Sequence, residues 1–409
     1  MNSIQTINPL LPDYRFLLGK LSCIENLVEE STNKDKAIIL SYLERIKQST
    51  LQDSWGKKIS SRKLKVLNSL IKKFYPPLEE TYILALVKSA LNQLNYLKQL
   101  SQINRLNKDR IPLNSLGLSL EECTGLLKQL GHLLNYLEII KTPFKDLQRI
   151  LPLCSNLSTL HLQNCAIHPE HLKVLPDFPQ LVCLDLSGNQ IDEEGLAIIL
   201  QKFPHLQVLD LKENPIASIQ GLKNTSDLEE LYLSFTYLEH HRIIDLPQVK
   251  LQNLRILDLS YNFIENIAYV LSQCSLNLEG LFIAGNDLTS EDAKYLIKLN
   301  QDELTLLDVS HNQLGDEGFK ILSEGFVSLQ DFDASYNNLT NAALTALEHL
   351  STLQTLQLDG NEIDDEGITE LINYLPNLED LSIKNNSIGA IGEARLKEKF
   401  NMNITDMTV

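Results

Sequence analysis

The sequence predicts an α/β solenoid over residues 106–409, preceded by an all-α region over residues 1–105. An eleven-residue phrase, with apolar residues at positions 1, 4, 6 and 11 and Asn at position 9, occurs ten times between residues 157 and 388. Its copies follow one another every 22 to 26 residues, which is a typical period for stacked repeats. The copies begin at Leu157, Leu181, Leu206, Leu228, Leu254, Leu278, Leu304, Leu329, Leu353 and Leu378.

Each copy predicts one short strand. In the clearest copy, Leu257 and Leu259 alternate with polar residues, as a half-buried strand requires. Asn262 follows at position 9, where the chain leaves the strand. A buried amide must be hydrogen-bonded, so we expect these Asn side chains to bond the backbone of the neighbouring coil, one above the next. Cys165 and Thr236 replace Asn in two copies.

Helical stretches lie between the predicted strands. Acidic residues followed by apolar residues at helical spacing predict short amphipathic helices with acidic N-caps at Asp192, Asp316 and Asp364. The copy from Leu206 is shorter, and its Ile216, Ile219 and Leu222 predict a tighter outer turn.

These repeats resemble the ribonuclease-inhibitor-like subtype of the leucine-rich repeat proteins. The resemblance implies a curved horseshoe, with a parallel sheet on the concave side and helices on the convex side. It also implies that positions 3, 5, 7 and 8 of the phrase point away from the core.

The array is predicted to extend beyond the ten clear copies. Residues 134–144 fit a degenerate copy. Residues 106–116 fit a poorer one, with Asp109 at the fourth position and Ile111 at the sixth. After the last copy, residues 393–400 predict a short helix with a polar outer face, as the end of a repeat array requires.

Residues 1–105 show helical periodicity without the repeat, which predicts a small helical domain or a cap on the solenoid. Within it, residues 61–74 predict a basic amphipathic helix. A core-packed helix with a solvated lysine face is the favoured interpretation. Contact with an anionic membrane, or docking against an acidic solenoid, are the alternatives.

Charge divides the chain in the same way. Residues 1–105 carry a net charge of +7, and residues 106–409 carry −24, of the total −17. An acidic solenoid should repel nucleic acid and anionic membranes and favour a basic protein partner.

Composition and motifs argue against catalysis. The chain has no GxxxxGK[ST], GxSxG, HExxH or CxxC motif, so we expect no catalytic residues, no metal and no cofactor. The histidines of residues 168–171 and 240–241 are interpreted as polar loop residues, and Cys123 as a packed thiol. Six scattered cysteines and a start without a signal segment or membrane span favour reduced thiols and a cytoplasmic location.

Aromatic and acidic residues at positions 5 and 8 are the candidate partner-binding residues. Aspartate is a common residue at position 5 of such repeats, so its presence there needs no function. The aromatic residues are not common in this sense and remain to be explained. The candidates are Asp210, Tyr232, Phe235, Asp258, Tyr261, Phe282, Asp308, His311, Asp333 and Tyr336. Exposed aromatic residues surrounded by charge are typical of an interface centre.

These observations predict a non-catalytic module that binds a protein on its concave face. An adaptor or enzyme whose N-terminal helices act, and whose repeats select the target, is the alternative. In style the chain also resembles effector proteins that intracellular bacteria such as Legionella deliver into host cells. That resemblance implies an effector delivered into the host cytosol, and a eukaryotic cytosolic repeat protein is the other option.

Overall fold

The computed structural model describes residues 110–112, 124, 127–128 and 131–400, apart from 225–226, 239–242, 245, 250, 300–302 and 376–377. The chain divides into two compact units, residues 1–108 and 109–409. The expected N-terminal helices, including the basic helix 61–74, lie outside the described residues. So do Cys123 and His240–His241.

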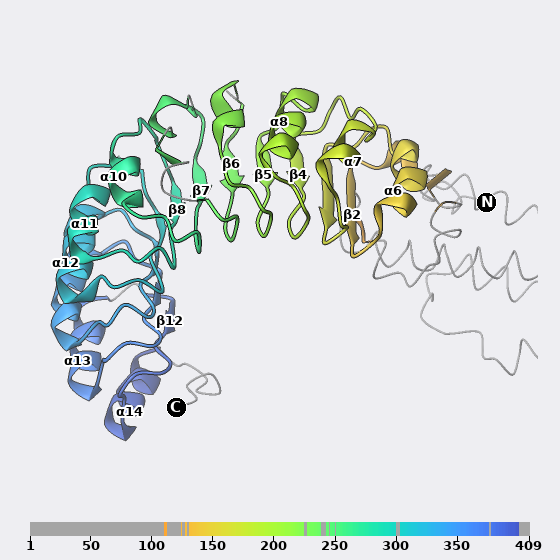
Figure 1. The fold of residues 1–409 in the computed structure, drawn as a ribbon. Coiled ribbons are helices and arrows are strands. Elements are labelled where there is room, and N and C mark those ends of the chain that lie inside the picture. Colours follow the sequence, from red (N-terminus) through yellow and green to blue (C-terminus); the bar gives the residue numbers. More distant parts are fainter. Residues whose placement is uncertain are drawn as a thin grey trace, which may run out of the picture. The chain divides into compact units, whose positions relative to one another are not determined.

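In the described part of the second unit, twelve strands form one parallel sheet in chain order. Figure 1 shows the sheet along the inner side of the curved stack, with the helices outside it. The solenoid prediction is therefore confirmed. The strands are β1 (Arg110–Pro112), β2 (Tyr136–Ile140), β3 (Thr159–Gln163), β4 (Cys183–Asp185), β5 (Val208–Asp210), β6 (Glu230–Tyr232), β7 (Ile256–Asp258), β8 (Gly280–Phe282), β9 (Leu306–Asp308), β10 (Asp331–Asp333), β11 (Thr355–Gln357) and β12 (Asp380–Ser382).

The strand register follows the repeat phrase. Residues at position 4 lie opposite one another in neighbouring strands, as Leu231 and Leu257 do. The first strand corrects one prediction, because Ile111 lies opposite Leu137 and therefore holds position 4 rather than position 6. A shift of two residues keeps the same side chains facing the core, so the apolar pattern alone could not distinguish the two registers.

The outer segments are helical, as predicted. The α-helices are α6 (Phe144–Ile150), α7 (Pro169–Lys173), α8 (Glu193–Lys202), α10 (Ile267–Ser272), α11 (Ser290–Leu296), α12 (Gly315–Gly325), α13 (Asp365–Tyr374) and α14 (Ala390–Phe400). The 3-10 segments are η2 (Gly131–Leu133), η3 (Leu151–Leu153), η4 (Gln220–Asn224), η5 (Leu246–Gln248) and η6 (Asn341–His349). The tighter turn expected after Leu206 is η4, with Ile216, Ile219 and Leu222 buried.

Two of the three predicted acidic caps are confirmed. The side chain of Asp192 accepts a hydrogen bond from the N–H of Gly195, and that of Asp364 accepts one from Glu366. The prediction for Asp316 is wrong, because α12 already begins at Gly315. The Asp316 carboxylate instead accepts the N–H and the hydroxyl of Thr340, both at 2.7 Å, and so holds the start of η6 in the next coil.

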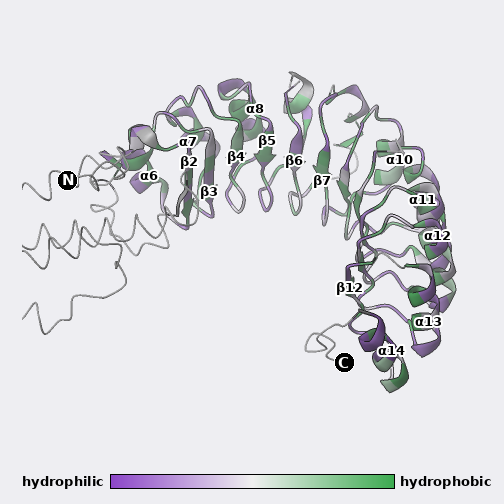
Figure 2. Ribbon diagram, turned by 180° about the vertical axis from the view of Figure 1, so that it is seen from behind, coloured by the Kyte–Doolittle hydropathy of each residue, from purple (hydrophilic) through white to green (hydrophobic). Residues whose placement is uncertain are grey.

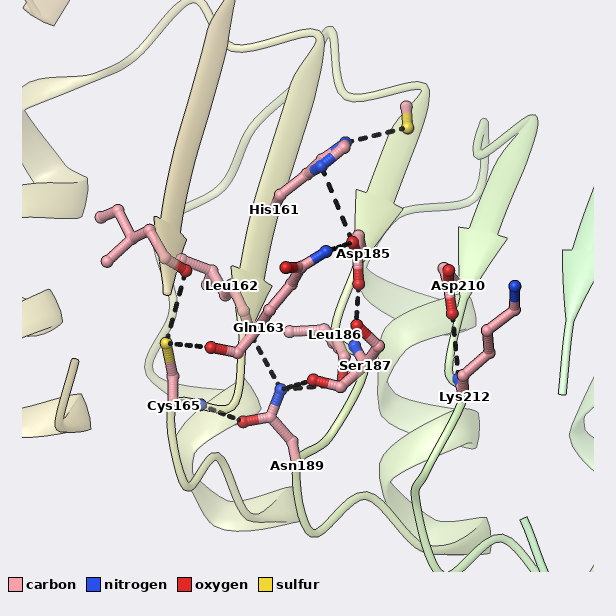
Figure 3. Close-up of polar contacts among 12 residues, drawn as sticks. His161, Leu162, Gln163, Cys165, Asp185, Leu186, Ser187, Asn189, Asp210 and Lys212 are labelled. Atoms are coloured by element: carbon pink, nitrogen blue, oxygen red, sulfur yellow. Dashed lines mark hydrogen bonds and ion pairs between the residues drawn. The ribbon is translucent and has the colours of Figure 1, made fainter. Parts of the chain in front are cut away.

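The buried amides form the predicted ladder. Oδ1 of Asn262 accepts the N–H groups of Thr236 and Leu238 in the preceding coil, at 2.8 and 3.3 Å. Its Nδ2 donates back to the carbonyl of Leu233 at 2.7 Å. Figure 3 shows the same contacts at Asn189, whose Oδ1 receives the N–H of Cys165. Each amide thereby satisfies backbone groups of two coils.

Hydrophobic side chains fill the space between the sheet and the helices, and Figure 2 shows hydrophobic colour concentrated in the strands. At the C-terminal end, α14 covers the last coil with Leu396, which is fully buried, while Arg395 and Lys397 are exposed. This helix overlaps the segment for which a capping helix was predicted, and it begins earlier than predicted, at Ala390. No helix of the described residues is long and apolar enough to cross a membrane.

Candidate partner-binding surface

The position 5 residues form one column across the sheet. The register pairs Asp210 with Tyr232, Tyr232 with Asp258, and Asp258 with Phe282. It continues from Phe282 through Asp308 to Asp333. Neighbouring strands lie about 4.8 Å apart, so these side chains are immediate neighbours.

The aspartates of this column also have a structural role. Each accepts a hydrogen bond from the N–H two residues ahead, at distances of 2.8 to 3.0 Å. Asp258 differs from the expectation of an open concave face, because only 6% of it is exposed and its carboxylate forms an ion pair with Lys212 at 3.2 Å. The frequent Leu-Asp-Leu sequence is therefore explained by these local hydrogen bonds. Only part of the position 5 column is accessible to a partner.

Burial and mutual repulsion perturb two of these carboxyl groups. Burial raises the pKa of Asp210 to about 6, and the nearby charges of Asp185 and Asp258 add to the shift. Burial likewise raises the pKa of Asp308 to about 6, with further contributions from Asp333 and Asp258. Ionising these groups is costly, and a cation placed on the column would relieve that cost.

Lys212 supplies one such cation from within the chain. Its Nζ lies 4.5 Å from the centre of the Tyr232 ring as well as 3.2 Å from Asp258. The Tyr232 hydroxyl donates to Glu230 at 2.8 Å. Tyr232 and Asp258 are thus already in contact with a lysine of the chain. Phe282, the next residue of the column, is half-buried.

The position 8 residues lie in the turn that follows each strand, and their backbone is left-handed throughout. Their φ angles lie between 54° and 65°, at Lys141, Asn164, Gly188, Glu213, Phe235, Tyr261, Gly285, His311, Tyr336, Gly360 and Asn385. Gly and Asn adopt this conformation readily, but a bulky side chain raises the energy by about 1 kcal/mol. Aromatic residues at this position are therefore not required by the turn.

The aromatic side chains of these turns form a row, called here the aromatic row: Phe235, Tyr261, His311 and Tyr336. The rings of Phe235 and Tyr261 stack with centroids 4.5 Å apart, and those of His311 and Tyr336 stack at 4.3 Å. Tyr261 and His311 connect the two pairs at 5.8 Å. The row spans five successive coils because Tyr261 also covers the glycine of the coil between them.

Glycine makes this covering possible. A Cβ added to Gly285 would stand 2.5 Å from the Tyr261 ring, and one added to Gly360 would stand 2.2 Å from the Tyr336 ring. Both distances are far below van der Waals contact. A ring at position 8 therefore leans over the following coil and needs glycine, or another ring to stack on, at the same position there.

The structure divides the predicted site residues into two groups. Asp210, Tyr232, Asp258, Phe282, Asp308 and Asp333 lie in the strands, whereas the aromatic row lies in the turns at the edge of the sheet. Two aromatic residues were missed by sequence reasoning. Tyr237 and Phe263, at position 10 of adjacent copies, are 75% and 70% exposed and also left-handed. The sequence did mark these two residues, because most other copies have a polar residue at position 10.

A Cys–His–Asp arrangement lies at the N-terminal end of the sheet (Figure 3). His161 Nε2 is 3.8 Å from the Cys183 sulfur, and Nδ1 is 3.6 Å from Asp185 Oδ2. Burial and the neighbouring carboxylates raise the pKa of Cys183 to about 11. A nucleophilic thiolate requires the opposite shift, so these contacts describe a protonated, packed thiol.

The histidines of residues 168–171 form a helix cap. The N–H of His168 donates to Nδ1 of His171 at 3.1 Å, and the His171 ring stacks on Phe144 at 4.0 Å. Within the residues that the structure describes, no three His, Cys, Asp or Glu side chains gather into a metal site.

Comparisons with known proteins agree with this architecture. The family model described as Leucine Rich repeat matches residues 180–199, 304–320 and 349–371. The chain is 29% identical over 252 residues to adenylate cyclase of Schizosaccharomyces pombe, covering 56% of this chain and 14% of the cyclase. It is 29% identical over 173 residues to lumican of Homo sapiens, covering 41% of this chain and 47% of lumican.

Among solved structures, a chain of the yeast Rad7–Elc1 complex matches with a TM-score of 0.48 at 18% identity, covering 82% of this chain and 98% of that one. The repeated phrase, the inner parallel sheet and the Asn ladder define a solenoid of the leucine-rich repeat class. Three stretches of the chain match the leucine-rich repeat model, so the chain contains leucine-rich repeats. It spans 14% and 47% of the length of the two relatives named above.

Proposed function

We propose that this chain is a non-catalytic protein-binding module that receives a basic protein surface across the coils from Leu228 to Leu339. The position 5 column contributes the negative charge and the aromatic row contributes apolar contact area. The observation that supports this most is the aromatic row itself. Phe235, Tyr261 and Tyr336 adopt a backbone conformation that Gly or Asn provides at lower cost in neighbouring coils.

Charge supports the proposed character of the partner. Asp308 and Asp333 pair in register, and the pKa of Asp308 is raised by burial and by this neighbour. A basic surface would reduce that repulsion, and steering by the acidic residues should speed its association. Large aromatic side chains commonly supply the anchors of such interfaces, at about 2 kcal/mol or more each.

The test is capture of proteins by the full chain from a cell extract, followed by affinity measurement with the captured partner. The double variant Tyr261→Ala with Phe282→Ala should abolish capture. Its matched control replaces Tyr269 and Tyr295, which pack against each other on the outer helices at 5.5 Å, and should leave capture unchanged.

Association kinetics test the charge. Asp308→Lys should slow association in a salt-dependent way, whereas Glu317→Lys makes the same charge change on α12 and should not. If the inner-face variants leave affinity unchanged while changes within residues 1–105 destroy it, the adaptor alternative is favoured instead. Delivery as a bacterial effector and a cytoplasmic location are proposals that rest on the sequence alone.

A further inference from the structure

One end of the aromatic row is open. Phe235 stacks on Tyr261 through one face at an interplanar angle of 8°, yet 49% of Phe235 remains exposed. Rings at position 8 lean toward the following coil, so the other face of Phe235 is turned toward the preceding coil. The residue at position 8 of that coil is Glu213, whose N–H donates to the carbonyl of Ser234 at 2.9 Å. This backbone contact places Glu213 in the coil on the side of Phe235 that faces away from Tyr261.

Glu213 is an exposed carboxylate in the left-handed conformation. No hydrogen bond or ion pair of its carboxylate occurs with the residues that the structure describes. The other end of the row differs, because the Tyr336 ring covers Gly360 and its hydroxyl receives a hydrogen bond from Asn385. An unpaired carboxylate therefore stands next to an uncovered ring at only one end.

The chain itself shows what fits such a pair. Lys212 lies over the Tyr232 ring and forms an ion pair with Asp258, so one cation contacts both an aromatic face and a carboxylate. Phe235 and Glu213 are likewise an aromatic ring and a carboxylate in adjacent coils, three residues after Tyr232 and Asp210, which pair in register. No cation of the described residues contacts them. Tyr237, two residues after Phe235, adds exposed apolar surface beside it.

We propose that the open end of the aromatic row, Phe235 with Glu213, binds an arginine side chain of the partner protein. A guanidinium group is planar, so it can stack parallel to Phe235 and extend a row whose members already stack in parallel. Its paired N–H groups match the two oxygens of Glu213. The ammonium group of lysine can contact a ring and a carboxylate, as Lys212 does, but it cannot stack in parallel or pair with two carboxylate oxygens as a planar fork. The inference deepens the proposed function by naming a side chain that the basic partner contributes.

Peptides provide the probe. Immobilised Gly-Arg-Gly-Arg-Gly, its lysine counterpart and its citrulline counterpart are tested against the full chain by biolayer interferometry. The arginine peptide should bind at least about fivefold more tightly than the lysine peptide, and the uncharged citrulline peptide should not bind. In protein with ring-labelled phenylalanine, the NMR signal lost in Phe235→Leu should shift when the arginine peptide is added.

Variants separate this site from the acidic column. Phe235→Leu and Glu213→Gln should each reduce the preference for arginine over lysine to about one. The control Glu362→Gln removes an exposed carboxylate in a distant coil and should preserve the preference. Asp308→Lys should weaken both cationic peptides without changing their ratio.

Equal binding of the arginine and lysine peptides, or no shift of the Phe235 signal, would overturn the arginine site. If both peptides then still depend on Asp308, the acidic column of the proposed function stands without it. Failure of both peptides to bind would also overturn the arginine site, and protein capture by the full chain would test the proposed function independently. Tighter binding of a proline-rich peptide of equal length would assign the ring to a different ligand.

Discussion

The Tyr336 ring rests directly on the backbone of Gly360, so that a Cβ added to the glycine would lie 2.2 Å from the nearest ring carbon. Gly360 also has a φ of 64°, in the left-handed region. Two independent requirements, backbone conformation and space for the ring, therefore select glycine in this coil. The same pair of requirements holds for Gly285 beneath Tyr261.

Gly360→Ala should destabilise the protein by about 2–3 kcal/mol, because left-handed strain adds to the displacement of the ring. Gly315→Ala is the matched control. Gly315 has a φ of 57° with nothing within 4 Å of its added Cβ, so only the strain of about 1 kcal/mol applies. Urea unfolding measures both. Adding Tyr336→Ala to Gly360→Ala should recover the difference, and equal losses at the two glycines would refute the packing argument.

The Asn ladder gives a second prediction. Asn262→Leu should lower the free energy of unfolding by at least about 1–3 kcal/mol, because the N–H groups of Thr236 and Leu238 lose their acceptor in a buried site. Gln190→Leu removes an exposed amide and should change stability little. Thermal unfolding of the two variants compares them. A loss at Asn262 no larger than that at Gln190 would mean that the ladder is not a major source of stability.

Regular features of the repeat were predictable, because one physical rule acts in every coil. The buried leucines, the Asn ladder, the helices and the parallel sheet follow from period and polarity. The hydrogen bond between Asp316 and Thr340 was not predictable. Thr340 lies in the next coil, and only the fold brings the two residues together. The predicted register of Ile111 was wrong because a shift of two residues leaves the apolar pattern intact.

The residues of the candidate surface could be selected from the sequence, but their geometry could not. Aromatic residues at position 8 stood out in the sequence, yet their left-handed backbone and mutual stacking depend on the turn conformation. Tyr261 and His311 lie two coils apart and still approach to 5.8 Å, because the Tyr261 ring extends across Gly285. Strand spacing alone does not predict this contact. It also does not predict the ion pair between Lys212 and the Asp258 carboxylate.

Asp308 makes stability depend on pH. Its folded-state pKa of about 6 lies above the ordinary value, so the folded protein binds more protons than the unfolded chain between about pH 4 and pH 6. The contribution of Asp308 to the free energy of unfolding therefore decreases as pH rises through this window. Asp308→Asn keeps an oxygen that can accept the Ser310 N–H and removes the charge. It should stabilise the protein by about 1–2 kcal/mol at pH 7 and have little effect below about pH 4.

Urea unfolding at a series of pH values tests this. Asp258→Asn is the comparison, because it breaks the ion pair with Lys212 and should give no gain at pH 7. A gain from Asp308→Asn that is the same at pH 4 and pH 7 would contradict an origin in the charge of Asp308.

Cys183 gives the last prediction. Its sulfur lies 3.8 Å from His161 Nε2, in an arrangement that resembles the one used by thiol nucleophiles, but burial and nearby carboxylates raise the pKa of Cys183 to about 11. Alkylation by iodoacetamide, followed at Cys183 by mass spectrometry of digested protein, should therefore reach half its maximal rate near pH 11 in the folded chain. In urea the same thiol should react with a midpoint near its ordinary pKa of about 8.5. His161→Ala should not slow alkylation at pH 7, because no thiolate–imidazolium pair is lost. A midpoint below pH 8 that rises in His161→Ala would instead show an activated thiol and reopen the case for catalysis on the inner face.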